Sequence, residues 1–228
     1  MLDWNKIETV FFDMDGTLLD LHFDNYFWLQ HLPKRYAEIK NASPAETKER
    51  LHSLYLAHQG SLNWYCLDFW SKELGINVAI LKHEIKNLIA YRPDARKFLQ
   101  WLHQQEKDIA IVTNAHWDSV ELKIAETDLS VFFNEIICSH DFSFEKESSF
   151  FWTSLQEKRA FNPATTVFFD DNETVLSAAK EFGIRYLFSI RQPDSQKPPR
   201  IENEFTMVHS FLDLLPKAAA GKRNRHIR

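Results

Sequence analysis

The chain has 228 residues, of which 44% are hydrophobic and 26% are charged, and its formal net charge is −5. This composition is ordinary for a globular protein and argues against a disordered, collagen-like or membrane protein. The mild charge argues against a generally basic nucleic-acid binder. The two distant cysteines, Cys66 and Cys138, argue against a disulfide framework or a thiolate zinc site. The length suits one large domain or a core with one insertion.

The start of the sequence bears on localisation, and its end bears on flexibility. Residues 1–6 (MLDWNK) have neither a basic segment nor an apolar stretch of the secretory kind, so we expect a cytoplasmic protein. No apolar run approaches the roughly 20 residues that span a bilayer, so we expect no membrane association. Residues 217–228 contain the basic stretch KRNRHIR, and we expect them to form a flexible, solvated tail.

The first predicted element is a strand over residues 7–12, an apolar run that ends at the polar turn DMDGT. A short apolar run closed by a polar turn is typical of a buried parallel strand. Four later runs share this pattern and predict strands over residues 109–112, 136–138, 166–169 and 186–188.

Residues 21–90 interrupt this pattern, and we call them the helical insertion. They contain many aromatic residues and no convincing strand, while Gly60 and Gly75 mark breaks between helices. Ser43 and Pro44 predict a helix start, with serine as the cap and proline in the first turn. We therefore expect several helices between the first strand and the rest of the sheet.

Helices are also predicted between the later strands. They cover residues 95–105, 119–126, 150–161 and 174–182, the last with Gly183 as its C-cap. Strands that alternate with helices predict right-handed crossovers and a parallel sheet covered on both faces. The expected fold class is therefore α/β, with a Rossmann-like core over residues 1–20 and 91–216 and an inserted all-helical segment.

Polar side chains follow three of the predicted strands. They are Asp13 and Asp15, Thr113 and Asn114, and Asp170 and Asp171. Parallel strands bring their carboxyl ends to one edge of a sheet, where ligands of such folds bind. Carboxylates gathered there would repel one another without a cation, and an all-oxygen ligand set favours Mg²⁺.

A phosphate monoester is the expected guest, because Mg²⁺ prefers to share its coordination shell with water and phosphate oxygens. Asp13 can attack phosphorus to form an aspartyl-phosphate, and Asp15 can protonate the leaving oxygen and then deprotonate water. Thr113, with Asn114 beside it, can donate to a phosphoryl oxygen. Lys146 can add positive charge where the transferring group builds negative charge.

At these residues the sequence resembles the haloacid dehalogenase-like (HAD) phosphohydrolase superfamily, subfamily I. Residues 13–20 (DMDGTLLD) are similar to its first motif. Thr113 is similar to the second motif, Lys146 to the third, and the pair Asp170 and Asp171 to the fourth. The four motifs stand in the expected order along the chain.

The resemblance implies roles for these residues. Asp13 would be the nucleophile and Asp15 the acid and base. Metal contacts would come from Asp13, from the backbone carbonyl of Asp15 and from Asp170, with Asp171 in support. The helical insertion would be a C1-type cap that closes over the substrate.

A narrower resemblance reaches into the helical insertion. Residues 21–28 (LHFDNYFW) and 62–70 (LNWYCLDFW) are similar to bacterial HAD nucleotidases that act on GMP and IMP. This implies a purine 5′-nucleotide as the small-molecule partner, hydrolysed to nucleoside and phosphate. The candidates for contact with the nucleotide are Asp24, Tyr26, Asn63, Trp64, Tyr65 and His116, although most aromatic residues of the insertion are expected to pack in a core.

Several alternatives stay open. The enzyme could be a phosphoglycolate-type or other small-metabolite phosphatase, and a HAD-like protein could also bind a phosphate ligand or a partner without turnover. The aspartates and Thr113 could be turn or helix-capping residues, and Lys146 a solvated surface lysine. A calcium loop is disfavoured, because it needs glycine at its sixth position, where Leu18 stands.

Overall fold

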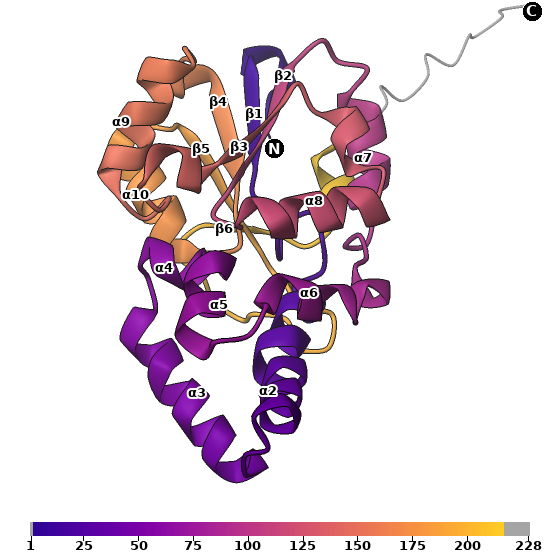
Figure 1. The fold of residues 1–228 in the computed structure, drawn as a ribbon. Coiled ribbons are helices and arrows are strands. Elements are labelled where there is room, and N and C mark those ends of the chain that lie inside the picture. The colour runs from indigo at the N-terminus through magenta and orange to yellow at the C-terminus, as the bar shows by residue number, and fades with distance from the viewer. Residues whose placement is uncertain (1, 217–228) are drawn as a thin grey trace, which may run out of the picture.

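A six-stranded parallel sheet forms the core of the computed structural model, which describes residues 2–216 (Figure 1). The strand order is β3-β2-β1-β4-β5-β6. The strands are β1 (Thr9–Phe12), β2 (Asp108–Thr113), β3 (Glu135–Cys138), β4 (Thr166–Phe169), β5 (Tyr186–Ile190) and β6 (Thr206–Val208). The predicted α/β fold class is thus confirmed, whereas the predicted tail of residues 217–228 lies outside the described residues.

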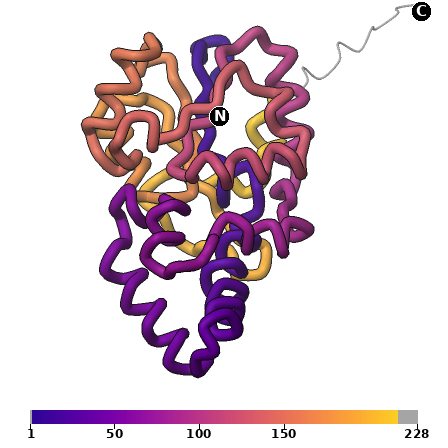
Figure 2. Tube along the Cα trace, viewed as in Figure 1, coloured from indigo at the N-terminus to yellow at the C-terminus, as the bar shows by residue number. Residues whose placement is uncertain are grey.

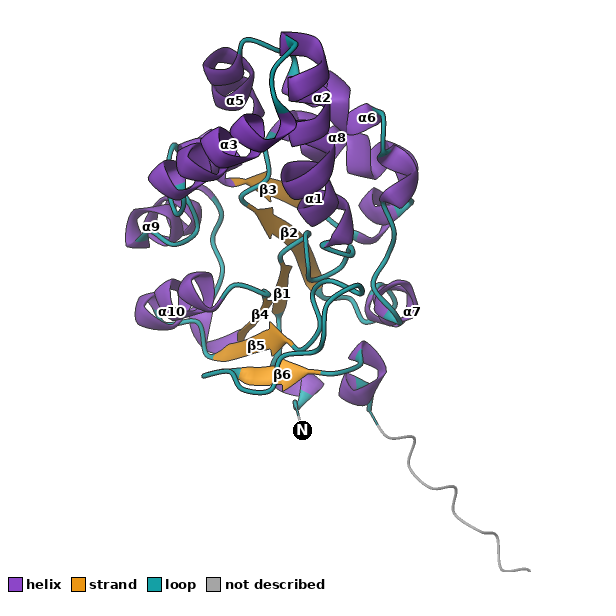
Figure 3. Ribbon diagram, turned by 90° about the horizontal axis from the view of Figure 1, so that it is seen from below, coloured by secondary structure: helices purple, strands orange, loops and turns teal. Residues whose placement is uncertain are grey.

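Four helices cover the two faces of the sheet, with α7 and α8 on one face and α9 and α10 on the other (Figure 3). They are α7 (Ala95–Leu102), α8 (Trp117–Glu126), α9 (Ser149–Lys158) and α10 (Glu173–Phe182). Side chains alternate along β1, so Val10 and Phe12 pack with Phe98 of α7. Phe11 points the other way and packs with Trp152 of α9.

The helical insertion lies between β1 and β2 in the chain, as predicted. It forms the indigo-to-purple lobe beside the core in Figure 2 and has its own hydrophobic cluster around Trp70 and Phe27. Its helices are α1 (His22–Tyr26), the π-helix η2 (Phe27–His31), α2 (Leu32–Lys40), α3 (Pro44–His58), α4 (Leu62–Tyr65), α5 (Leu67–Leu74), α6 (Val78–His83) and the 3₁₀ turn η3 (Lys86–Leu88).

The two connections of the insertion run side by side. The amide of Asp20 donates to the carbonyl of Ala90 at 2.8 Å, and the amide of Arg92 donates to the carbonyl of Leu18 at 2.9 Å. Both ends of the insertion are therefore fixed just beyond the turn that follows β1.

The structure differs from the predicted elements in a few places. The five predicted strands agree within two residues at each end. Strand β6 was not predicted, because it is a three-residue edge strand and its sequence, TMV, forms no longer apolar run. The helix predicted over 150–161 ends at Lys158, since Phe161 packs against Phe11 from a loop. The helix predicted over 95–105 ends at Leu102.

Helix ends within the insertion follow the sequence signals in position. Helix α3 starts at Pro44 with Ser43 before it, although the Ser43 side chain makes no capping hydrogen bond. Helix α5 ends at Leu74, and Gly75 follows as its C-cap with a positive φ of 61°.

Short 3₁₀ turns connect the larger elements of the core. They are η1 (Trp4–Lys6), η4 (Leu129–Phe132), η5 (Ser139–Phe142), η6 (Pro163–Thr165) and η7 (Phe211–Leu214). Among residues 2–216, none of the helices is both long enough and apolar enough to cross a membrane.

Candidate active site

The backbone ladder of the sheet continues into the first residues after β1 and β4. The amide of Asp13 donates to the carbonyl of Phe169 at 2.8 Å, and the amide of Asp170 donates to the carbonyl of Phe188 at 3.1 Å. These bonds fix both aspartates at the carboxyl edge of the sheet, where the sequence predicts them.

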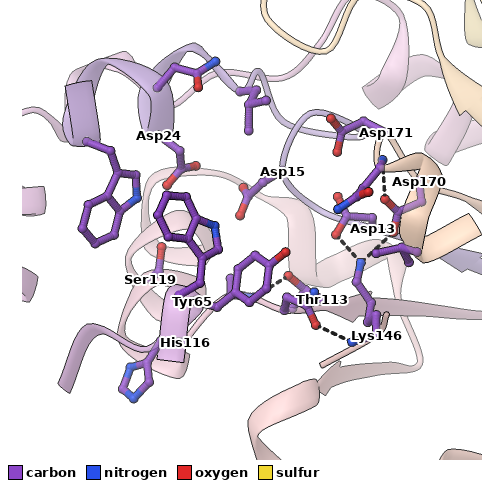
Figure 4. A pocket seen from close by; sticks show the side chains of 18 of the residues that line it. Asp13, Asp15, Asp24, Tyr65, Thr113, His116, Ser119, Lys146, Asp170 and Asp171 are labelled. Carbon is purple, nitrogen blue, oxygen red and sulfur yellow. Dashed lines mark hydrogen bonds and ion pairs between the residues drawn. The ribbon is translucent and has the colours of Figure 1, made fainter. Parts of the chain in front are cut away.

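Three carboxylates meet at this edge. One oxygen atom from each of Asp13, Asp170 and Asp171 lies within 4.8 Å of the other two. Asp13 and Asp170 are buried, and Asp171 accepts a hydrogen bond from Arg200 at 3.3 Å. The three side chains lie together at one end of the cavity drawn in Figure 4.

Lys146 joins this group from the loop after η5, far along the chain. Its Nζ donates to Asp13 Oδ1 and to Asp170 Oδ2, each at 2.7 Å, and to the carbonyl of Val112 at 3.0 Å. Only 2% of the side chain is exposed, so Lys146 is not a solvated surface lysine. Its ammonium is held between two buried carboxylates.

Burial raises the pKa of all three carboxyl groups, although Lys146 opposes the shift. The pKa of Asp13 rises to about 7, that of Asp170 to about 6 and that of Asp171 to about 7. Their mutual repulsion adds to the effect of burial. One buried lysine therefore does not balance two buried carboxylates and a partly buried third, and a further cation would favour their ionised forms.

The donor set fits a hard divalent cation. All three candidate ligands are carboxylates, and oxygen ligands are those that Mg²⁺ prefers over softer metals. Asp13, Asp170 and Asp171 are the residues that would hold it. The side chain of Asp15 is not part of this group.

Gly16 lets the turn after β1 pass close to Asp171. Its φ is +83°, and a Cβ atom added there would lie 2.8 Å from Asp171 Cγ. A side chain at this position would therefore both strain the backbone and displace one of the three clustered carboxylates.

A second network surrounds Thr113 and Asn114. Thr113 is buried, and its Oγ1 accepts from the amide of Ala115 at 3.0 Å. Asn114 uses both polar atoms on the Lys146 loop: its Oδ1 accepts from the Lys146 amide at 2.9 Å, and its Nδ2 donates to Glu147 Oε2 at 2.8 Å. Asn114 thus holds the loop that carries Lys146.

Glu147, which the sequence analysis missed, joins this network to the helical insertion. Its Oε1 accepts from the hydroxyl of Tyr65 at 2.7 Å and from Asn172 Nδ2 at 3.3 Å. The one feature of the sequence that could have pointed to Glu147 is its position directly after Lys146.

A cavity of about 270 Å³ lies between the three carboxylates and the insertion. Of the residues predicted to contact a nucleotide, those in its lining are Asp24, Trp64, Tyr65 and His116. Tyr26 and Asn63 lie outside the lining. The sequence analysis missed other residues of this wall, among them Asn25, Trp28, Lys82 and Ser119.

Both carboxylate oxygens of Asp24 accept hydrogen bonds from buried lysines. Lys82 Nζ donates to its Oδ1 at 2.7 Å, and Lys123 Nζ donates to its Oδ2 at 2.8 Å. Burial would raise the pKa of Asp24, but Lys123 and Lys82 outweigh burial and hold that pKa below its usual range. The only sequence signal for Lys82 is weak: it stands four residues after the buried Val78 on the same helix face.

Comparison with known proteins identifies relatives of this chain. Residues 10–188 match the haloacid dehalogenase-like hydrolase family. The chain is 34% identical over 213 residues to the GMP/IMP nucleotidase YrfG of Escherichia coli (strain K12), which covers 93% of this chain and 96% of the relative. It is 25% identical over 138 residues to the phosphoglycolate phosphatase of Aliivibrio fischeri, which covers 58% and 60%.

Solved structures share the fold. A HAD phosphatase from Thermococcus onnurineus matches with a TM-score of 0.74 at 22% identity, covering 91% of this chain and 96% of that one. The magnesium-bound HAD-hydrolase YfnB of Bacillus subtilis matches with a TM-score of 0.62 at 20% identity, covering 91% and 96%.

The raised pKa values predict how stability depends on pH without metal. Because Asp13, Asp170 and Asp171 hold protons to higher pH in the folded chain than in the unfolded chain, the free energy of unfolding in EDTA should fall between about pH 5 and about pH 8. Mg²⁺ should offset this loss, since it binds the ionised carboxylates. Urea unfolding with EDTA and with Mg²⁺ at both pH values measures the effect. A stabilisation by Mg²⁺ that is as large at pH 5 as at pH 8 would contradict it.

The contact between Gly16 and Asp171 predicts a second effect on metal binding. Gly16→Ala should weaken Mg²⁺ affinity about 10–100-fold, because the new Cβ displaces Asp171. Gly60→Ala is the matched control: its φ of +81° imposes a similar backbone cost, but nothing lies within 4 Å of the added Cβ. Calorimetric Mg²⁺ titration compares the two variants, and equal affinities would refute the contact argument.

Proposed function

Because this chain belongs to the haloacid dehalogenase-like hydrolase family, we propose that it is a magnesium-dependent phosphomonoesterase that acts through an aspartyl-phosphate on Asp13. One observation carries the proposal: the buried group in which Lys146 bridges Asp13 and Asp170 beside Asp171. That group combines a carboxylate nucleophile, a cation and a metal-ligand set at one end of a cavity.

The reaction proceeds in two steps. Asp13 attacks phosphorus, the bond from phosphorus to the ester oxygen breaks, and Asp15 gives the departing oxygen its proton. Asp15 then takes a proton from water, the resulting hydroxide oxygen bonds to phosphorus, and the carboxylate of Asp13 is released. The second step returns to Asp15 the proton that the first step removed, so hydrolysis needs only water as co-substrate.

Charge stabilisation comes from fixed groups around phosphorus. When held by Asp13, Asp170 and Asp171, Mg²⁺ supplies positive charge to the phosphoryl oxygens. Lys146 adds an ammonium whose position is set before the substrate binds, so little reorganisation is needed during the reaction. Thr113 Oγ1 accepts a hydrogen bond from the Ala115 amide, and this bond leaves the hydroxyl hydrogen free. That hydrogen can be donated to a phosphoryl oxygen.

The proposed substrate is a purine 5′-nucleotide such as GMP or IMP. The 34% identical nucleotidase of Escherichia coli supports it, and so does the aromatic wall of the cavity. Trp28 and Trp64 stack at 6.4 Å with 22° between their planes, and Tyr65 lines the same cavity. Aromatic faces of this kind bind a planar base well.

The proposal places the base against Trp64 and Tyr65, with His116 near the ribose. Asp24 is assigned no contact with the base, since both its oxygens are bound by lysines. Tyr26 and Asn63 are assigned none, because neither lines the cavity.

A phosphoglycolate-type phosphatase is the second candidate, supported by the 25% identical relative from Aliivibrio fischeri. Such a small substrate would leave the aromatic wall uncontacted. The nucleotide therefore accounts for more of the cavity.

A panel of phosphate monoesters tests the substrate class. With Mg²⁺, GMP and IMP should be hydrolysed with kcat/KM at least about tenfold above phosphoglycolate and sugar phosphates, and EDTA should stop all turnover. Released phosphate is the readout. A preference for phosphoglycolate over GMP and IMP would defeat the nucleotidase assignment, and turnover that persists in EDTA would defeat the metal assignment.

Asp13→Asn tests the covalent step. The variant keeps the shape of the side chain but removes the nucleophile, so kcat should fall on the order of 10⁴-fold or more. Circular dichroism should show an unchanged fold. Asp3→Asn, the same change at an exposed site, should keep full activity. Near-normal turnover by Asp13→Asn would rule out the aspartyl-phosphate.

A further inference from the structure

Two buried lysines lie where the helical insertion meets the core, and the mechanism above does not use them. Lys82 of α6 is 3% exposed and Lys123 of α8 is 1% exposed. A buried ammonium is unfavourable unless anions pair with it, because removing the charge from water carries a large desolvation penalty. The partners of these lysines therefore indicate what the two residues do.

The lysines share two aspartates. Lys123 Nζ lies 2.8 Å from Asp24 Oδ2 and 2.6 Å from Asp15 Oδ1. Lys82 Nζ donates to Asp24 Oδ1 at 2.7 Å and to Ser119 Oγ at 3.0 Å. Two positive and two negative groups thus form one balanced cluster that spans the insertion and the core.

Helix α8 supplies the core side of this cluster. Ser119 and Lys123 are four residues apart, so they project from the same face of the helix, one turn from each other. Helix α6 packs against α8, and α1 contributes Asp24. The insertion therefore contacts Lys123 through a carboxylate that it holds in place with Lys82.

Asp15 forms an ion pair with Lys123. Figure 4 shows Asp15 between Asp24 and Asp13 along the cavity. Its Oδ1 is buried. The Lys123 ammonium, 2.6 Å away, is the ion-pair partner of this oxygen.

We propose that Lys123 is a positioning residue that holds the Asp15 carboxyl group at the cavity wall, and that the helical insertion holds Lys123 through Asp24. The inference rests on the proposed function, in which Asp15 protonates the leaving oxygen. It follows that the acid is in place when the insertion is packed on the core.

The acidity of the leaving group separates this role from a structural one. Para-nitrophenyl phosphate releases a stable phenolate that needs little protonation, whereas para-nitrobenzyl phosphate releases an alcohol oxygen that needs a proton. The two esters are similar in size, and kcat/KM reports the steps up to departure of the leaving group. Lys123→Met should lower kcat/KM about 10²-fold for the benzyl ester but less than about tenfold for the phenyl ester.

Two further variants sharpen the comparison. Lys123→Arg keeps the positive charge and should recover most of the benzyl-ester activity. Lys86→Met is the matched control, because Lys86 also joins the insertion to α8, through Glu126 at 2.7 Å, but is 51% exposed. It should leave the ratio of the two kcat/KM values unchanged. Equal losses on both esters in Lys123→Met would overturn the proposal.

A double variant guards against misfolding. Lys123→Met combined with Asp24→Asn removes one positive and one negative charge. The remaining charged residues, Lys82 and Asp15, cancel each other, so the cluster stays neutral. It should show the same selective loss on the benzyl ester, and equal losses would again overturn the proposal. If the unaltered enzyme hydrolysed no phosphate monoester at all, the proposed function would fail instead, so the two failures are distinguishable.

Discussion

The gathering of two buried carboxyl groups and a partly buried third beside one lysine is the constraint on which the site depends. Desolvation penalises each charge, and the ammonium of Lys146 between Asp13 and Asp170 recovers only part of that penalty. The remaining imbalance persists because the sheet holds the aspartates by their backbone, whatever their side chains prefer. A fold selected for stability alone would not gather these groups, so their meeting at one edge marks this edge as functional.

The aromatic core explains how the sheet tolerates that imbalance. Phe12 stacks on Phe169 at 4.9 Å, and Phe169 stacks on Phe188 at 5.3 Å. Phe12 and Phe169 directly precede Asp13 and Asp170 in the chain. Such rings pack tightly in three adjacent strands and leave little freedom for the turns that follow. The rigidity needed for chemistry thus comes from apolar packing, and the polar residues are placed by the strands that precede them.

Much of this arrangement could be predicted, because strand ends and local motifs depend on residues that are adjacent in the sequence. An apolar run followed by Asp13 or Asp170 specifies both a buried strand and the edge where it ends. Lys82 and Lys123 could not be found in this way, since a lysine becomes a buried partner only through helix packing. Lys123 meets Asp24 across 99 positions of sequence. Likewise, the aromatic cluster of the insertion does not reveal that Trp64 faces the cavity while Tyr26 lies outside its lining.

Glu147 carries a consequence for protein engineering. It follows Lys146 directly and accepts hydrogen bonds from Tyr65 of the insertion and from Asn114 and Asn172 of the core. A chimaera that joined this core to a foreign lobe lacking a hydroxyl at that point would leave a carboxylate oxygen short of a donor, next to the lysine that pairs with Asp13. The helical insertion and the core therefore depend on each other at this contact, and exchanging one of them requires a redesign of Glu147.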